Sequence, residues 1–360
     1  MALTGNKGEW SEIYTLFKLL GDGKVHAGDA EMHKLALYYP ILNIIREESK
    51  LYEYKPNSDQ HIVVINEDGN EIVRISMDRF LQESAYLIEE IKKNSKGTFS
   101  VPQSENFMKE IGCSKLKAPS RDKADIHIMI HDVRQGMPHL LGFSIKSQLG
   151  SPSTLLNAGE TTNILYKVEG EILTDSDIQE LNSIDKHQDR MEALLDKGCK
   201  LTFDDIENQT FKNNLLFLDY CMPQFIADCL LTYCMPNSIS PIKQTVEEIA
   251  QINPFNFTGS NVLSFYEHKM KVLLLDVALG MTPGKEWKGQ YDANGGYLVV
   301  RKDGEIVCYH FYNRNDVEDY LYNNTRFESA SRSRYNYGSL FRGEDGNVYI
   351  RLNLQIRFRK

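Results

Sequence analysis

Two short stretches in the middle of the chain, residues 125–131 and 140–146, constrain the fold most. The first alternates between polar and apolar side chains, as in a strand with one buried face. The second is mainly apolar and lies between a proline and a glycine, which predicts a buried strand. Because turn-forming residues connect the two stretches, we expect neighbouring strands of one sheet.

This pairing would bring an acid and a cation together. Asp125 opens the first stretch, and Lys146 ends the second. A carboxylate and an ammonium at one sheet edge suit metal-dependent phosphodiester cleavage. There the acid holds a divalent cation, and the lysine orients a water or steadies the charge on phosphorus. An ordinary hairpin with one Asp–Lys pair would have the same spacing, so the spacing alone leaves both interpretations open.

Composition narrows the class of protein. A chain of 360 residues corresponds to about two domains of ~150 residues each. No apolar run approaches the ~18–20 residues of a membrane span, so no membrane partner is expected. The six cysteines form no CxxC pair, which predicts free thiols in a reducing cytoplasm. A metabolic enzyme of the mixed α/β kind is a further alternative that lacks support, because the sequence contains no P-loop, GxGxxG or GxSxG pattern.

The charge of the chain is unevenly distributed. The whole chain carries a net charge of −9, but residues 326–360 contain eight Lys or Arg against three acids, a local charge of +5. A basic face on an acidic body is compatible with a nucleic-acid partner, because only the docking surface has to complement phosphates.

The pattern along the chain predicts a mixed α/β (α+β) fold. Residues 8–20 read as an amphipathic helix, residues 61–76 as a hairpin with an Asp-Gly turn, and residues 29–49 as a mixture of helix and turn. We expect a mixed sheet flanked by helices in residues 1–168, a mainly helical region in 169–282 and a β-rich region in 283–360.

The end of the chain reads as one alternating strand. Its apolar positions from Ile350 to Phe358 form one face, and Arg, Asn and Gln form the other. These polar types pair with guanine and adenine edges or bind phosphate, although a plain exposed strand remains an alternative. With the basic stretch before it, this predicts a DNA-contacting set: Arg326, Arg332, Arg334, Arg351, Asn353, Gln355 and Arg357.

Three strings carry a resemblance to a known family. They are Gly-Asn-Lys-Gly-Glu-Trp-Ser-Glu at 5–12, Gly-Phe-Ser-Ile-Lys-Ser-Gln-Leu-Gly at 142–150 and Leu-Asn-Leu-Gln-Ile-Arg-Phe at 352–358. In this order they resemble the HpaII-type family of type II restriction endonucleases. Asp125 with Ser144-Ile-Lys146 looks like a variant of the PD-(D/E)XK nuclease core, which implies a restriction-endonuclease-like sheet.

The resemblance implies a Mg²⁺-dependent enzyme that cuts double-stranded DNA at a short palindrome, with CCGG as the family's site. It also implies a homodimer, since a twofold-symmetric site is matched most simply by a twofold-symmetric protein. A non-catalytic DNA-binding or regulatory protein with a degenerate nuclease core is the alternative.

That alternative arises because Ser144 stands where the general pattern places an acid. A metal held by Asp125 alone would lack anionic oxygen ligands. The missing carboxylate could be Glu12 or Glu9 from the first helix, with Glu12 preferred, or Glu160 further along the chain. Gln148, on the same side of the strand as Lys146, could support the site as a neutral ligand.

Overall fold

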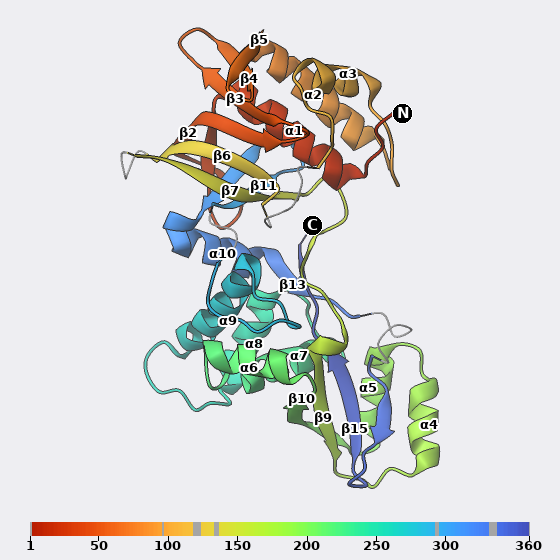
Figure 1. Cartoon of the computed structure of the whole chain (residues 1–360). Helices are drawn as coiled ribbons and strands as arrows, with labels where there is room; N and C mark the ends of the chain where they lie inside the picture. The colour runs from red at the N-terminus through yellow and green to blue at the C-terminus, as the bar shows by residue number, and fades with distance from the viewer. Residues whose placement is uncertain are drawn as a thin grey trace. The chain divides into compact units, whose positions relative to one another are not determined.

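The computed structural model describes residues 2–95, 97–117, 124–132, 137–291, 295–330 and 337–359. The chain forms two compact units (Figure 1). The first contains Met1–Ser153 and Tyr291–Tyr320, and the second contains Thr154–Gln290 and Leu321–Arg359. The predicted middle region 169–282 lies within the second unit, and region 283–360 is shared between the two. The three-region division remains a prediction.

The first unit is built on a nine-stranded mixed sheet. Its strand order is β1-β12-β11-β7-β6-β2-β3-β4-β5, and β1 also pairs with β2, so six of the strands form a closed circuit. The pairs β7–β11 and β1–β12 are parallel, and the other pairs are antiparallel. The strands are β1 (Lys24–Gly28), β2 (Lys34–Glu47), β3 (Leu51–Asn57), β4 (Ile62–Glu67), β5 (Asn70–Ser76), β6 (Ile126–Asp132), β7 (Met137–Ser147), β11 (Gly296–Val300) and β12 (Ile306–His310).

Three helices lie beside this sheet: α1 (Lys7–Asp22), α2 (Met77–Lys93) and α3 (Pro102–Glu110) (Figure 1). Helix α1 begins with a capping box between Asn6 and Glu9 and ends at Gly23, whose φ of 65° favours glycine. Its apolar side chains are buried, with Trp10 and Phe17 at 0% exposure. The helix is therefore fixed in the core of the first unit.

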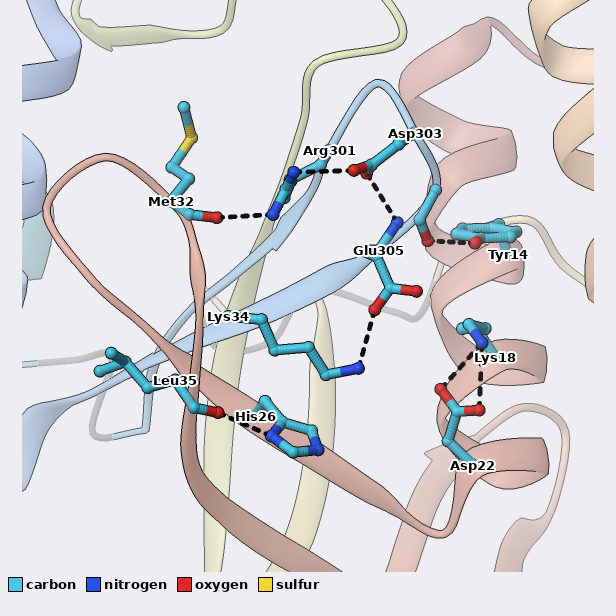
Figure 2. A network of polar contacts seen from close by, with 11 residues as sticks. Tyr14, Lys18, Asp22, His26, Met32, Lys34, Leu35, Arg301, Asp303 and Glu305 are labelled. Atoms are coloured by element: carbon cyan, nitrogen blue, oxygen red, sulfur yellow. Dashed lines mark hydrogen bonds and ion pairs between the residues drawn. The ribbon is translucent and has the colours of Figure 1, made fainter.

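Hydrogen bonds and an ion pair join β11, β12 and the turn between them to the N-terminal part of the first unit (Figure 2). The Tyr14 hydroxyl on α1 donates to the Gly304 carbonyl in this turn. Arg301 donates to the Met32 carbonyl at 3.0 Å, and Lys34 pairs with Glu305 at 3.0 Å. Two strands that lie in sequence between the two segments of the second unit are thereby built into the first unit.

The second unit combines helices with two smaller sheets, ordered β10-β9-β15-β14 and β13-β16-β8. Its strands are β8 (Thr154–Leu156), β9 (Asn163–Glu169), β10 (Lys200–Ile206), β13 (Thr325–Phe327), β14 (Leu340–Arg342), β15 (Val348–Asn353) and β16 (Ile356–Phe358). Its helices are α4 (Asp175–Ser183), α5 (His187–Asp196), α6 (Gln209–Leu218), α7 (Met222–Cys234), α8 (Ile242–Ile252), α9 (Val262–Leu279) and the end of α10 (Arg314–Asn324).

Among the described residues, no single helix is long and apolar enough to span a membrane. Helices α6 and α7 meet that criterion only as a pair, which is bent by 107°. All six cysteines are free thiols, and Cys221 is the one that is not fully buried.

The mixed α+β fold with a large mixed sheet confirms the predicted class and is consistent with a restriction-endonuclease-like fold. The helix at the N-terminus, the hairpin with the Asp-Gly turn and the paired strands around Asp125 and Lys146 are also confirmed. The prediction of helix and turn for residues 29–49 was wrong, because most of this stretch is strand β2. The prediction of a single strand at the end of the chain was also wrong. This stretch forms two strands, β15 and β16, which belong to different sheets.

Candidate active site

The hairpin of β6 and β7 brings Asp125 next to the catalytic candidates of β7. The Asp125 amide donates to the Phe143 carbonyl at 2.9 Å. Its carboxylate oxygen Oδ2 accepts from the Ile145 amide at 2.7 Å and from the Ser144 hydroxyl at 3.1 Å. Ser144, the residue in place of an acid, therefore holds the Asp125 carboxylate in position. The other oxygen, Oδ1, has no hydrogen-bond partner among the described residues.

Glu12 enters the same site from helix α1. The neighbouring Ser11 hydroxyl lies 2.8 Å from the Ser147 hydroxyl at the end of β7, so the helix is joined to the strand that carries Lys146. Burial, and next the negative charge of Asp125, raise the pKa of Glu12 to about 8. Two carboxylates that repel each other in this way form an arrangement that a bound cation would relieve.

Two opposing effects act on the pKa of Lys146. Burial lowers the pKa of Lys146, while Asp125 and Glu12 act in the opposite direction. Its Nζ atom lies 5.2 Å from the ring centroid of Tyr297, close enough for a cation–π interaction. Tyr297 stands on β11, whose register pairs Val299 with Lys146. Sequence reasoning missed Tyr297, since only the parallel pairing of β7 and β11 brings it here.

A second feature missed from the sequence is a buried ion pair behind the site. Arg46 Nε donates to Glu48 Oε1 at 2.9 Å, with both side chains almost fully buried. The Ser114 hydroxyl donates to the same carboxylate at 2.7 Å, and Arg46 donates to the Lys115 carbonyl at 2.6 Å. The positive charge of Lys117, and next that of Arg46, lowers the pKa of Glu12 and partly offsets its burial.

The acids and the lysine of the candidate site line one cleft of about 860 Å³. Glu12, Asp125 and Lys146 stand together in it, and the wall continues through Lys7, Asn94 and Thr98. Two catalytic candidates predicted from β6 and β7 and one of the predicted helical acids thus lie in one cavity, which lies entirely within the first unit.

The remaining candidates occupy other surroundings. Glu9 accepts from the Asn6 amide at 2.8 Å in the capping box and pairs with Lys117 at 3.2 Å. The Gln148 amide nitrogen lies 3.4 Å from the Met32 sulfur. Glu160 belongs to the second unit, on the 3-10 helix Glu160–Thr162. Glu12 is therefore the acid from this set that lines the cleft with Asp125.

A group of three other possible metal ligands occurs in the described part of the chain. The ligand atoms of Asp29, Glu31 and His33, on the loop between β1 and β2, lie within 4.8 Å of one another. One Asp29 oxygen already accepts from the Glu31 and His33 amides at 3.0 and 2.7 Å. This group is an exposed loop feature and does not line the cleft.

Most of the predicted DNA-contacting residues that can be described are engaged within the second unit. Arg351 pairs with Glu207 at 2.6 Å, and Arg326 and Arg357 share Glu328 at 3.3 and 2.5 Å. Asn353 is 1% exposed and donates to the Asn163 side chain at 2.7 Å.

The other three members of that set differ in how far they can be placed. Gln355 is 9% exposed. Arg332 and Arg334 lie outside the described residues.

Comparison with known proteins gives the family. The sequence profile of the HpaII restriction endonuclease family matches residues 6–358. The chain is 43% identical over 360 residues to the type II restriction enzyme HpaII of Haemophilus parainfluenzae, across 99% of this chain and 98% of that protein. This chain belongs to the HpaII restriction endonuclease family. No solved structure matches it.

Membership of the HpaII restriction endonuclease family makes this chain a nuclease of a restriction–modification system, with DNA as its substrate. It also confirms the resemblance of the three strings, which fall inside the matched range. The cleft of Glu12, Asp125 and Lys146 is the part of the described structure whose chemistry fits that activity.

The donor set of the cleft fits a divalent cation. Mg²⁺ binds oxygen ligands and typically takes one or two carboxylates together with water and phosphate oxygens. Among the described residues one Asp125 oxygen has no hydrogen-bond partner, and burial together with the charge of Asp125 raises the pKa of the second carboxylate, Glu12.

Proposed function

We propose that this chain is a Mg²⁺-dependent type II restriction endonuclease that hydrolyses both strands of DNA at CCGG. The observation that carries the proposal is the meeting of Glu12, Asp125 and Lys146 in one cleft. The site CCGG is the recognition sequence implied by the resemblance to the family. A relative named as the type II restriction enzyme HpaII supports the activity.

In this mechanism Asp125 and Glu12 would hold Mg²⁺. When bound, Mg²⁺ offsets the negative charge that develops on the phosphate and on the departing 3′ oxygen. The Ile145 amide and the Ser144 hydroxyl fix Asp125, so this ligand needs little reorganisation. Ser144 therefore acts as a positioning residue for the carboxylate.

Lys146 positions the attacking water. Its ammonium, held over the Tyr297 ring, sits beside the two carboxylates and can donate to the water or to a phosphate oxygen. The water oxygen bonds to phosphorus as the bond from phosphorus to the 3′ oxygen breaks. One proton leaves the water and one is taken up by the departing oxygen, so the products are a phosphate monoester and a hydroxyl.

We assign the second metal ligand to Glu12 and not to the other predicted acids. Glu9 is engaged by the helix cap and by Lys117, and Glu160 is part of the second unit. Gln148 remains a proposed support of the site through its place next to the catalytic strand, with its amide beside Met32.

DNA contacts are proposed for the basic C-terminal part of the second unit. Arg326, Arg351 and Arg357 would exchange their carboxylate partners for phosphates or base edges. These pairs are partly exposed and therefore worth only ~0–1 kcal/mol each, so the exchange is inexpensive. Arg332 and Arg334 belong to the same basic stretch.

Two buried residues of the C-terminal strands, and the oligomeric state of the protein, complete the proposal. Asn353 and Gln355 would read base edges only after local rearrangement, since both are buried. We further propose a homodimer, which would match a palindromic site, and a cytoplasmic location, in keeping with the free thiols.

The test is digestion of a plasmid of known sequence by the purified protein, with Mg²⁺ and with a chelator. Discrete fragments that map to CCGG, formed only with Mg²⁺, are the expected result. Discrete fragments at another sequence would contradict the CCGG assignment. Tight binding without cleavage would instead support a non-catalytic DNA-binding protein.

A further inference from the structure

The cleft extends beyond the three residues assigned to catalysis. Among the described residues that line it, the carboxylates are Glu12 and Asp125 and the cations are Lys146 and Lys7. The rest of the wall is neutral and made mainly of small polar side chains and glycines, including Asn94, Thr98 and Ser151. One cation in this cleft, Lys7, therefore has no role in the proposed hydrolysis.

Lys7 is held firmly in relation to the catalytic strand. Its carbonyl accepts from the Ser11 hydroxyl at 2.7 Å, and that hydroxyl is the one that contacts Ser147 at the end of β7. A Cβ added at Gly150 would lie 3.4 Å from the Lys7 Cβ, so the lysine stem runs close to the loop after β7.

The stability of the protein does not explain a lysine at this position. Lys7 is the first residue of α1, where a positive charge opposes the helix dipole by roughly 0.3–1 kcal/mol. Among the described residues Lys7 has no ion-pair partner, and the nearby Glu9 is paired with Lys117. A half-buried lysine in a polar cleft, with no ion-pair partner among the described residues, is suited to an anion from solution.

We propose that Lys7 binds a phosphodiester of the DNA strand being cut, next to the scissile phosphate. This inference rests on the proposed nuclease function. Lys7 and Glu12 are five residues apart on α1, about 7.5 Å along the helix axis. A DNA strand rises about 3.4 Å per nucleotide, so the phosphate at Lys7 is about two nucleotides from the metal site.

The occupant is the sugar–phosphate backbone and not a base. An ammonium with neutral hydroxyl and amide neighbours matches phosphate oxygens, which carry no sequence information. Lys7 should thus strengthen binding to all DNA sequences alike and place the strand for attack at the neighbouring phosphate.

The experiment measures binding of a CCGG duplex in Ca²⁺ over a range of salt concentrations. Lys7→Gln should lower the slope of log K against log salt by about 0.9 for each Lys7 contact, which is roughly eightfold weaker binding at 0.1 M salt. Lys7→Arg should retain most of the affinity.

The matched control is Lys18→Gln, which removes a cation from the C-terminal half of the same helix. Lys18 pairs with Asp22 at 3.0 Å (Figure 2). It does not line the cleft. This variant should bind with the wild-type slope.

A second measurement replaces single phosphates of the duplex by methylphosphonates. At one position near the cut, the replacement should weaken binding by the wild-type protein but have little effect on Lys7→Gln. An unchanged salt slope in a folded Lys7→Gln protein would overturn the proposal, as would a loss confined to CCGG duplexes. If the wild-type protein neither binds nor cuts DNA, the proposed function itself fails, and that outcome is distinct.

Discussion

At the scale of single residues, the three acids near the site differ in their contacts and surroundings. The Asp125 carboxylate is held by an amide and a hydroxyl. Glu12 lines the cleft, where burial and the charge of Asp125 raise its pKa. Glu9 caps its own helix. The sequence predicted Asp125 and Lys146 because strand pattern and spacing are local properties. It left the second acid open, because the contact of α1 with β7 is tertiary and has no local signature.

The two glutamates of α1 make a matched pair for mutation. Glu12→Gln should reduce the cleavage rate in Mg²⁺ by more than the roughly 10–100-fold that loss of an outer-shell partner causes, because it removes a proposed ligand. Glu9→Gln should cut at nearly the wild-type rate, because glutamine keeps the capping hydrogen bond and loses only the charge near the helix N-terminus that pairs with Lys117, about 0.3–1 kcal/mol of stability. The reverse order of rates would transfer the ligand role to Glu9.

The raised pKa of Glu12 has a consequence for stability without metal. Its pKa is 4.5 in the ordinary case and about 8 when folded, so between these values the folded state binds more protons than the unfolded state. Stability should therefore fall as pH rises from about 5 to 8, and Glu12→Gln should remove this loss. In urea unfolding with a chelator present, the free energy of unfolding of Glu12→Gln should exceed that of the wild type by roughly 1–3 kcal/mol at pH 8 and by little at pH 5. If variant and wild type differed in unfolding free energy by the same amount at both pH values, the titration of Glu12 would not be the cause.

At the scale of secondary-structure elements, the site depends on neighbours distant in sequence. Helix α1 meets β7 through Ser11 and Ser147, and β11 places Tyr297 against Lys146. Hairpins and helices with a clear period were predictable, since their signals lie within about fifteen residues. Strand β2 was not, because its first five residues are exposed or half-exposed and lack strict alternation. The final strand was divided because its two halves pair with different partners.

Strand β11 should affect catalysis through the ring of Tyr297. Tyr297→Leu removes a desolvated cation–π contact of about 1–2 kcal/mol, so the cleavage rate should fall roughly 5- to 30-fold. The ring favours the ammonium form of Lys146, so its loss should also move the alkaline limb of the pH–rate profile to lower pH. Tyr297→Phe keeps the ring and should retain both. A slower Tyr297→Leu enzyme with an unshifted profile would point to a structural role alone.

At the scale of the whole molecule, charge explains how an acidic protein can bind DNA. The chain carries −9, yet its C-terminal stretch is basic, and three of its arginines are paired with Glu207 and Glu328. The charge asymmetry was visible in the sequence. The carboxylate partners were not, because Glu207 lies 144 residues before Arg351.

Release of these arginines should strengthen DNA binding. Glu328→Gln frees Arg326 and Arg357 together, so affinity for non-specific duplex at 0.1 M salt should rise several-fold. Glu344→Gln makes the same charge change at an exposed turn, without an ion pair among the described residues, and should have a smaller effect. Equal affinities for the two variants would argue that the Glu328 pairs only stabilise the second unit.

Lys146→Ala is the variant that decides whether the cleft around Lys146 carries out the hydrolysis. Cleavage of a CCGG duplex in Mg²⁺ and binding of the same duplex in Ca²⁺ are measured side by side for the variant and the wild type. The variant should lose cleavage and still bind the duplex with nearly wild-type affinity. Cleavage by Lys146→Ala at the wild-type rate would contradict this role of the cleft.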